Sequence, residues 1–146
     1  MKLGKLHGIG IGAALAFSQL FHVSGKSMSP TINMKGNNSI LLLDKISSLL
    51  GMYSPKVNDV VVFSKPGMDK KSVVKRVKAI SGQSVLTKNG TVIIVKPGHF
   101  WAVGDNQTCS VDSNDYGQVP LQALIGRCLL IVPFDLQYLK RFIGLL

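Results

Sequence analysis

The chain has 146 residues, 46% of them hydrophobic, and a formal net charge of +10. Its length suits one compact domain with a short appendage, and nothing in it suggests two independent domains. The basic residues form no dense run and no RNA-binding aromatic signature accompanies them, so we expect no nucleic-acid partner. We interpret the charge as a solvated basic surface near membrane lipid.

The N-terminal segment is basic and then apolar. Lys2 and Lys5 precede an apolar stretch over residues 8–23, which is somewhat short for a spanning helix of about 20 residues. The pattern fits either a cleaved signal sequence or a retained anchor extended by lysines at its ends. We favour a retained anchor over residues 1–24, because cleavage near Val23 would leave the chemically interesting residues that follow on a frayed terminus.

The middle of the chain, residues 25–134, is predicted to be a mainly β domain. Short apolar runs rich in β-branched residues alternate there with turn residues. Asn89-Gly90 between two such runs predicts a β-hairpin, and residues 46–52 are expected to form a short helix or a loop insertion. The main expected strands are 40–43, 60–63, 73–80, 92–95, 100–103 and 124–132.

The tail, residues 135–146, has the spacing of an amphipathic helix. Leu136, Leu139 and Phe142 fall on one side and Lys140 on the other. Such a helix could pack on the core or lie on a membrane surface. The predicted organisation is therefore an anchor, a β domain and a short C-terminal helix.

Three local groups of residues could carry chemistry. The first, residues 25–31, contains Ser27; the second places Lys75 and Arg76 in an otherwise apolar strand; the third covers residues 104–114. Taken singly, each has an ordinary structural explanation, because serines before prolines shape turns and Gly-Asp-Asn is common in turns. Their combination and order decide the interpretation.

Metal and disulfide chemistry find little support in the sequence. Cys109 and Cys128 are too few for a disulfide framework and could pair only if the fold brings them together. The two cysteines and three histidines lack the clustered spacing of a zinc site. We expect no metal and no cofactor.

In this order the three groups resemble the motifs of the type I signal peptidase family. That family has Ser-Met-x-Pro-Thr at its nucleophile, Lys-Arg on a strand, and Gly-Asp-Asn-x-x-x-Ser-x-Asp-Ser downstream; here these motifs begin at Ser27, Lys75 and Gly104. A fourth motif, of the Gly-Asp-Val-Val kind, matches residues 58–63. The resemblance covers residues 8–133. Within the family it is closest to subunit 2 of the mitochondrial inner membrane protease, on the run Asp-Ser-Asn-Asp-Tyr-Gly-Gln-Val-Pro at residues 112–120.

The resemblance implies a signal-peptidase-type β domain with one N-terminal transmembrane helix and a short C-terminal helix. It makes Ser27 the nucleophile and Lys75 the general base, with Ser110 orienting the lysine amine. It also implies a structural ion pair between Arg76 and Asp112 beside the site. The further supporting positions are Met28, Gly104, Asp105 and Asn106.

The chemistry makes a demand on Lys75. A serine hydroxyl needs a base to take its proton, and lysine can do so only when neutral, although its ordinary pKa is about 10.4. Burial lowers the pKa of a lysine because desolvation disfavours the charged form. The apolar neighbours Val73, Val74 and Val77 could supply such surroundings.

Two positions depart from the family pattern. The acidic residue that often follows Lys-Arg in the sequence Leu-Pro-Gly-Asp is replaced, since residues 80–83 end in Gln83. Many bacterial members have an oxyanion-binding serine where this chain has Gly25. The oxyanion hole must then rely on backbone N–H groups, such as that of Ser27, or on another donor.

The resemblance implies a serine endopeptidase that removes sorting peptides from precursor proteins delivered to the mitochondrial intermembrane space. It implies a single-pass protein of the inner membrane facing that space, in a heterodimer with a related subunit. Alternatives remain open: a non-catalytic partner subunit, a bacterial-type signal peptidase I, or a Ser-His-Asp triad that uses His22 or His99. A repressor with a related Ser-Lys self-cleaving domain would need a helix-turn-helix where only an apolar stretch occurs.

Overall fold

The computed structural model describes residues 3–5, 18–33, 38–68 and 71–134. Within these residues the chain is almost entirely β, with two four-residue helices and one 3₁₀ turn. The helices are α2 (Ile46–Leu49) and α3 (Ser113–Tyr116), and the 3₁₀ turn is η1 (Leu121–Ala123). The strands are β1 (Leu3–Lys5), β2 (Ser18–Val23), β3 (Asn38–Asp44), β4 (Val60–Ser64), β5 (Ser72–Ile80), β6 (Ser84–Leu86), β7 (Val92–Ile94), β8 (His99–Val103), β9 (Val119–Pro120) and β10 (Leu124–Phe134).

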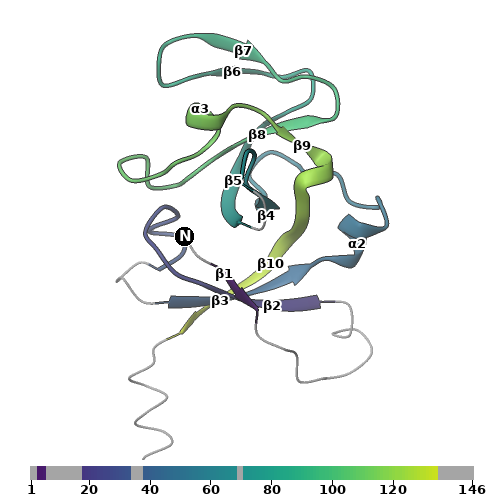
Figure 1. The fold of residues 1–146 in the computed structure, drawn as a ribbon, viewed down its shortest axis with the longest axis vertical. Helices are drawn as coiled ribbons and strands as arrows, with labels where there is room; N and C mark the ends of the chain where they lie inside the picture. The colour runs from purple at the N-terminus through teal and green to yellow at the C-terminus, as the bar shows by residue number, and fades with distance from the viewer. Residues whose placement is uncertain (1–2, 6–17, 34–37, 69–70, 135–146) are drawn as a thin grey trace, which may run out of the picture.

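Eight strands form one antiparallel sheet in the order β1-β2-β3-β10-β4-β5-β8-β9, and β6 with β7 forms a separate hairpin (Figure 1). The sheet curls, so that β2 and β3 lie across one end of the molecule and the β6–β7 hairpin lies at the other end. Each strand expected from the sequence overlaps an observed strand, which confirms the mainly β prediction.

The hairpin predicted at Asn89-Gly90 is present. Leu86 of β6 pairs with Val92 of β7, and the Gly90 N–H donates to the Thr87 carbonyl at 3.0 Å. Gly90 has a φ of +78°, which glycine adopts without the penalty that a side chain would add. The turn residues therefore close the hairpin as their chemistry requires.

Strand β10 connects the two halves of the sheet. Residues 124–127 pair with β4, and the rest of the strand continues along β3, so that Arg127 has partners on both sides. At Gly126 a β-carbon would come within 2.8 Å of the Asp44 carbonyl oxygen. Only glycine permits this close approach of two backbones.

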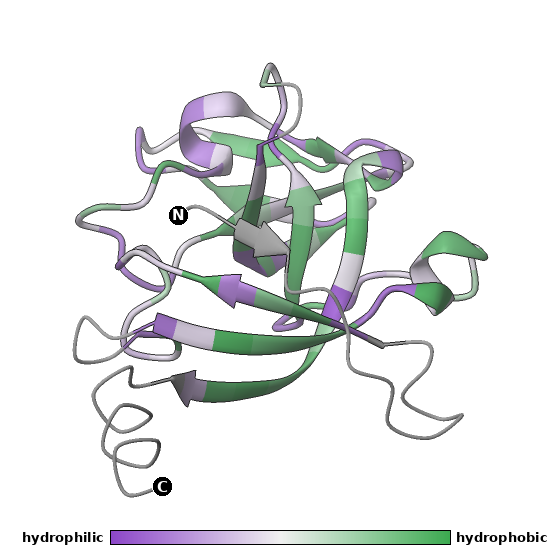
Figure 2. Ribbon diagram, turned by 60° about the horizontal axis from the view of Figure 1, so that its bottom comes forward, coloured by the Kyte–Doolittle hydropathy of each residue, from purple (hydrophilic) through white to green (hydrophobic). Residues whose placement is uncertain are grey.

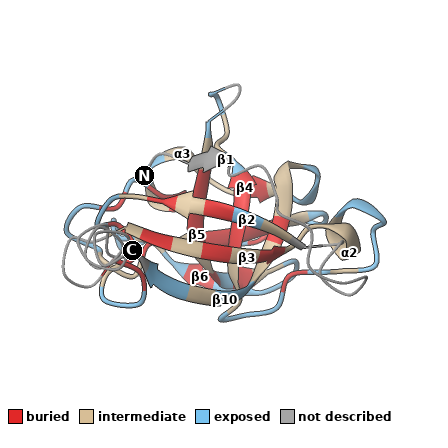
Figure 3. Ribbon diagram, turned by 90° about the horizontal axis from the view of Figure 1, so that it is seen from below, coloured by how far each residue is buried: buried red, intermediate tan, exposed pale blue. Residues whose placement is uncertain are grey.

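The core runs along the middle of the curled sheet (Figure 3). Strand β3 alternates strictly, with Leu41 and Leu43 fully buried. Strand β5 does not alternate over Val73, Val74 and Lys75, all of which are buried, because both of its faces are covered there. A lysine in this part of β5 is therefore cut off from water.

The expected membrane anchor is wrong for residues 18–23. These residues form β2, paired with β3 from Ser18 opposite Asp44 to Val23 opposite Ser39. Phe21 is 4% exposed and Val23 fully buried in the core, so the apolar side chains that suggested a membrane segment are covered by the protein itself. Residues 6–17 and the tail predicted as a helix lie outside the described residues. No helix among those described is long and apolar enough to span a bilayer.

The segment after β3 is confirmed as a short helix followed by a loop. Helix α2 begins at Ile46 and ends at Leu49, and the ribbon of this apolar segment extends outward from the body of the molecule (Figure 2). Leu49, Leu50 and Met52 are each more than 60% exposed. This turn lies apart from the residues that form the site described next.

Candidate active site

Ser27 lies in the loop between β2 and β3, and the next residue fixes that loop to the core. Met28 is fully buried, and its carbonyl accepts a hydrogen bond from the Ile32 N–H at 2.8 Å. On the other side, the Asn106 N–H donates to the Ser27 carbonyl at 3.0 Å. The backbone of Ser27 is thus held both by the core and by the loop that follows β8.

The Ser27 hydroxyl is buried and makes no hydrogen bond to a described residue. A buried hydroxyl without a partner costs free energy, so such groups often mark functional positions. The Ser27 hydroxyl and the Lys75 amine are therefore not hydrogen-bonded to each other here. Catalytic hydrogen bonds commonly tighten only when substrate binds.

Lys75 projects into the protein from the middle of β5 and is only 3% exposed. Its amine donates to Ser110 Oγ at 3.0 Å, and the Ser110 hydroxyl donates to Asp112 Oδ2 at 2.6 Å. The serine gives its single proton to the carboxylate, so it must accept from the lysine. A neutral Lys75 amine bound in this way keeps a lone pair free for another proton.

Burial lowers the pKa of Lys75, because the charged form loses its hydration. The negative charge of Asp112 opposes this effect without reversing it. The result is the condition that a lysine base requires: an amine that loses its proton more readily than a lysine in water.

Asp112 is completely buried and fully hydrogen-bonded. Besides Ser110, its carboxylate accepts from the Gly104 N–H at 3.0 Å and from the backbone and side-chain nitrogens of Asn114 at 3.1 and 2.9 Å. Burial alone would raise the pKa of Asp112, but these hydrogen bonds outweigh it and hold the pKa below its ordinary value. The same carboxylate caps α3 in a capping box with Asp115.

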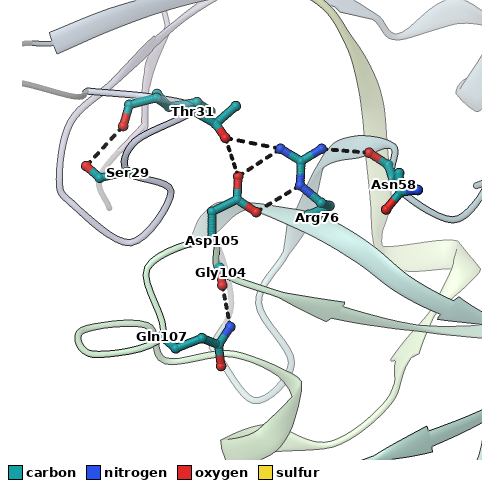
Figure 4. Close-up of polar contacts among 8 residues, drawn as sticks. Ser29, Thr31, Asn58, Arg76, Gly104, Asp105 and Gln107 are labelled. Atoms are coloured by element: carbon teal, nitrogen blue, oxygen red, sulfur yellow. Dashed lines mark hydrogen bonds and ion pairs between the residues drawn. The ribbon is translucent and has the colours of Figure 1, made fainter.

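The predicted ion pair between Arg76 and Asp112 is wrong, because Arg76 pairs with Asp105 (Figure 4). Arg76 Nε and Nη2 each lie 2.8 Å from one carboxylate oxygen of Asp105, in a bidentate contact. Successive side chains of a strand point to opposite faces. Since Lys75 points inward to the side where Asp112 is buried, Arg76 points away from it.

This second cluster fastens the loop that carries Ser27 to the sheet. Thr31 donates to Asp105 Oδ2 at 2.5 Å and accepts from Arg76 Nη2 at 3.2 Å, while Arg76 Nη1 donates to the Asn58 carbonyl at 2.9 Å (Figure 4). Hydrogen bonds from Arg76 and Thr31 overcome the effect of burial and lower the pKa of Asp105. The cluster acts on the loop that carries Ser27 and makes no hydrogen bond to Lys75.

Gly104 lies where the three groups of residues meet. A β-carbon at this position would collide with Ser110 Oγ and with the Ser27 carbonyl oxygen. The backbone φ here is not in the left-handed region, so the requirement for glycine comes from space alone. The structure therefore brings Ser27, Lys75 and the third group together around Gly104 and Ser110.

A model of the family described as "Signal peptidase, peptidase S26" matches residues 3–96. The chain belongs to this signal peptidase family. It is 39% identical over 106 residues to subunit 1 of the mitochondrial inner membrane protease of Schizosaccharomyces pombe, a match that covers 70% of this chain and 66% of the relative. The subunit 1 of Xenopus tropicalis is 34% identical over 118 residues, covering 77% of this chain and 68% of the relative.

Subunit 2 of the same protease from Danio rerio is 34% identical over 115 residues, covering 75% of this chain and 61% of the relative. The chain therefore spans about two thirds of the length of these relatives. The predicted signal peptidase family is confirmed. The relatives include both kinds of subunit, so they support the family more strongly than subunit 2 in particular.

Two residues of this candidate site had no role assigned to them from the sequence. Asn33, which is 5% exposed, donates to the Gly25 carbonyl at 2.9 Å and to the Val23 carbonyl at 3.3 Å, and so fixes the start of the loop that carries Ser27. Its φ of +60° is one that asparagine tolerates better than most residues, but nothing in the sequence announces it. Asn114, the last residue of the third group, contacts Asp112, and its place in that group is the one signal that pointed to it.

The remaining candidates make no hydrogen bond to the Ser27 hydroxyl. A ring nitrogen of His99 lies 2.9 Å from the Pro97 carbonyl, and neither His99 nor His22 of β2 hydrogen-bonds to Ser27. The Ser-His-Asp alternative therefore finds no support in the described residues. Cys109 and Cys128 are both free. Gly25 has a φ of +108°, which a serine would adopt only with strain.

Proposed function

We propose that this chain is a serine endopeptidase in which Ser27 is the nucleophile and Lys75 the general base. The observation that carries the proposal is the state of Lys75: a lysine 3% exposed, with a lowered pKa and its amine held by Ser110. A lysine that served only the fold would have no reason to be kept here, because a buried cation without a direct carboxylate partner is destabilising.

In the proposed reaction, the Ser27 hydroxyl gives its proton to the neutral Lys75 amine as its oxygen attacks the scissile carbonyl. Backbone N–H groups of the nucleophile loop stabilise the oxyanion, since Gly25 offers no hydroxyl. The protonated Lys75 then gives its proton to the leaving amine, which leaves an acyl-enzyme on Ser27. Water attacks this ester with Lys75 again acting as base, and the second product departs.

We propose precursor proteins with sorting peptides as substrates, cut after small residues. The support is the family and the names of the relatives, which are mitochondrial inner membrane proteases. On the same ground we propose that the chain works at the mitochondrial inner membrane, with its β domain on the intermembrane-space side. Protease added to mitoplasts should digest the β domain, whereas full protection would contradict this orientation.

We propose that residues other than Ser18–Val23 attach the chain to the membrane, because these six residues form a strand of the sheet. Carbonate extraction of membranes separates an integral protein from a peripheral one.

We also propose that the chain works beside a related subunit, since the relatives are named as subunits of one protease. The second candidate, a non-catalytic partner subunit, would keep the fold but would need neither Lys75 nor Ser27. Purification of the chain alone, followed by a processing assay with and without the related subunit, distinguishes an active from a supporting role.

The direct test is Ser27→Ala in a strain that lacks the wild-type copy. We expect processing of precursor to cease while the protein stays folded, because the alanine keeps the backbone contacts of the loop. Ser64→Ala, at an exposed position of β4, is the matched control and should process normally. Normal processing by Ser27→Ala would remove the nucleophile assignment.

A further inference from the structure

Asn114, the second residue of α3, bridges two parts of the molecule with its side-chain amide. Its Oδ1 accepts a hydrogen bond from the Lys88 backbone N–H at 3.0 Å, and its Nδ2 donates to Asp112 Oδ1 at 2.9 Å. One partner can only donate and the other, a carboxylate, can only accept, so the orientation of the amide is determined. Only a primary amide of this length offers both roles at this position.

The partner at Lys88 belongs to the β6–β7 hairpin, which lies outside the main sheet (Figure 1). The hairpin is fixed in place by more than this bond. Val85 packs in a core cluster with Trp101, and Gln118 bonds to both the Ile94 carbonyl, at 3.1 Å, and the Lys96 N–H, at 2.7 Å. The hairpin is therefore a firm support to which Asn114 is attached.

On its other side Asn114 continues into the active site. Its amide holds Asp112, Asp112 accepts from Ser110, and Ser110 accepts from the Lys75 amine. Each member after Asn114 is buried, and each bond lies between 2.6 and 3.0 Å. The hydrogen bonds thus connect the hairpin loop to the amine of Lys75 without interruption.

We propose that Asn114 is a positioning residue, which ties Asp112 to the β6–β7 hairpin and so fixes Ser110 and the Lys75 amine for proton transfer from Ser27. This inference rests on the proposed function, and it adds a role for the hairpin in that same site. Asn114 does not touch Ser27 or the reacting atoms; it acts through Asp112.

The neutrality of Asn114 is part of this role. The charged or titratable groups that act on Lys75 are Asp112, Asp115, Asp105, Cys109 and Lys65. Asn114 holds the nearest of them, Asp112, by hydrogen bonds without adding a charge. A carboxylate in its place would add negative charge next to Asp112, which favours the protonated form of Lys75.

The test measures the pH dependence of kcat and KM for cleavage of a precursor peptide by the full chain, with its related subunit if activity requires it. Asn114→Leu keeps the size and removes both hydrogen bonds. We expect kcat to fall about tenfold to a hundredfold with little change in KM, because misplacement of a catalytic group costs rate more than binding. Gln122→Leu, at an exposed position in η1, is the control and should keep wild-type kcat.

Asn114→Asp keeps the acceptor for the Lys88 N–H but adds a carboxylate beside Asp112. We expect the midpoint of the pH–rate profile to move upward by about half a unit or more. A merely structural residue would lower the yield or the melting temperature without moving this midpoint. The Asp variant preserves the hairpin contact, so it tests the proposal even if Asn114→Leu fails to fold.

An unchanged kcat in Asn114→Leu, or an unchanged midpoint in Asn114→Asp, would overturn the inference. Ser27→Ala in the same assay separates this failure from that of the proposed function. If Ser27→Ala is inactive and the Asn114 variants behave as wild type, only the inference about Asn114 falls. If Ser27→Ala is active, the Ser-Lys mechanism itself falls.

Discussion

Lys75 and Arg76 are neighbours on one strand, yet they lie in opposite electrostatic surroundings. Lys75 is 3% exposed, contacts a neutral hydroxyl and has a lowered pKa. The Arg76 side chain is 28% exposed, and its bidentate contact with Asp105 raises its pKa. Because successive side chains of a β-strand point to opposite faces of the sheet, a step of one residue is enough to produce this difference.

The comparison shows that two adjacent residues of the same charge can have different roles when one is buried and the other is paired with a carboxylate. The inner residue is deprived of water and of a direct carboxylate, so its proton is weakly held and available for chemistry. The outer residue is paired with a carboxylate and holds the loop that carries Ser27 through its hydrogen bond to Thr31. In the proposed mechanism, the positive charge on one face of β5 takes part in the reaction, whereas the one on the other face stabilises the structure.

We expect the largest loss of activity when Lys75 is replaced by a residue that always carries a positive charge. In Lys75→Arg the side chain cannot lose its proton near neutral pH, and we expect the processing rate to fall about a thousandfold or more, as for loss of a general base. Lys75→Met keeps length and apolar character, so it should fold and be equally inactive. Lys78→Met, at an exposed position of the same strand, is the control. An arginine variant with a near wild-type rate would exclude Lys75 as the base.

The second prediction tests the surroundings of Lys75 by filling the space between Ser110 and Ser27. Gly104→Ala would force a methyl group against Ser110 Oγ and the Ser27 carbonyl, which should cost about 1–3 kcal/mol of stability by overpacking and reduce activity more than tenfold. Gly98→Ala meets open space at a φ of +72°, so it should cost only backbone strain of about 1–2 kcal/mol. Equal activity losses in the two variants would contradict the role assigned to Gly104. Urea denaturation and a processing assay supply both readouts.

The third prediction concerns the pH dependence of stability. The folded pKa of Lys75 lies below its unfolded value, so between these two pH values the unfolded chain binds more protons than the folded one. In that window the contribution of Lys75 to the unfolding free energy rises with pH. Lys75→Met lacks this dependence, and we expect its stability advantage over wild type to shrink from pH 7 to pH 10. A constant difference across this range in urea titrations would mean that the lysine keeps an ordinary pKa.

The smallest effect concerns the outer pair. A double-mutant cycle of Arg76→Met with Asp105→Asn should give a coupling energy of about 1 kcal/mol, the upper part of the range for partly exposed ion pairs. The cycle of Arg76→Met with Asp112→Asn should give a value near zero, because these side chains lie on opposite faces of the strand. A larger coupling to Asp112 than to Asp105 would show that the ion pair of the sequence prediction was the right one.

Much of this candidate site could be predicted because its residues belong to short sequence motifs. Ser27, Lys75 and Ser110 stand in runs whose order along the chain identifies them, and the β-branched runs around Lys75 already predict burial. The partner of Arg76 could not be predicted, since Asp105 and Asp112 are both acidic residues of one motif. The two can be distinguished as partners of Arg76 only by the direction in which each side chain points. That direction depends on the register of β5 against β8.

The N-terminal segment shows where sequence pattern fails. Phe21 and Val23 are as apolar as residues in membrane spans. Composition alone therefore does not show whether such residues are buried in a bilayer or in a protein core. In β2 the two residues alternate with Leu20 and His22, which are more exposed. This period of two is too short a signal over six residues to outweigh the basic flank and the apolar run that precede it. Asn33 lacks even such a signal.

The position of β10 has a consequence for the order in which the molecule is built. The last described strand along the chain is inserted between β3 and β4, two strands that are synthesised much earlier. Neither half of the sheet has its hydrogen-bonding partner until residues 124–134 emerge, and long-range pairings of this kind form late and slowly. A nascent chain therefore cannot complete the eight-stranded sheet before residues 124–134 have been made. We expect the surroundings of Lys75 to reach their folded arrangement only after β10 has paired with both β3 and β4.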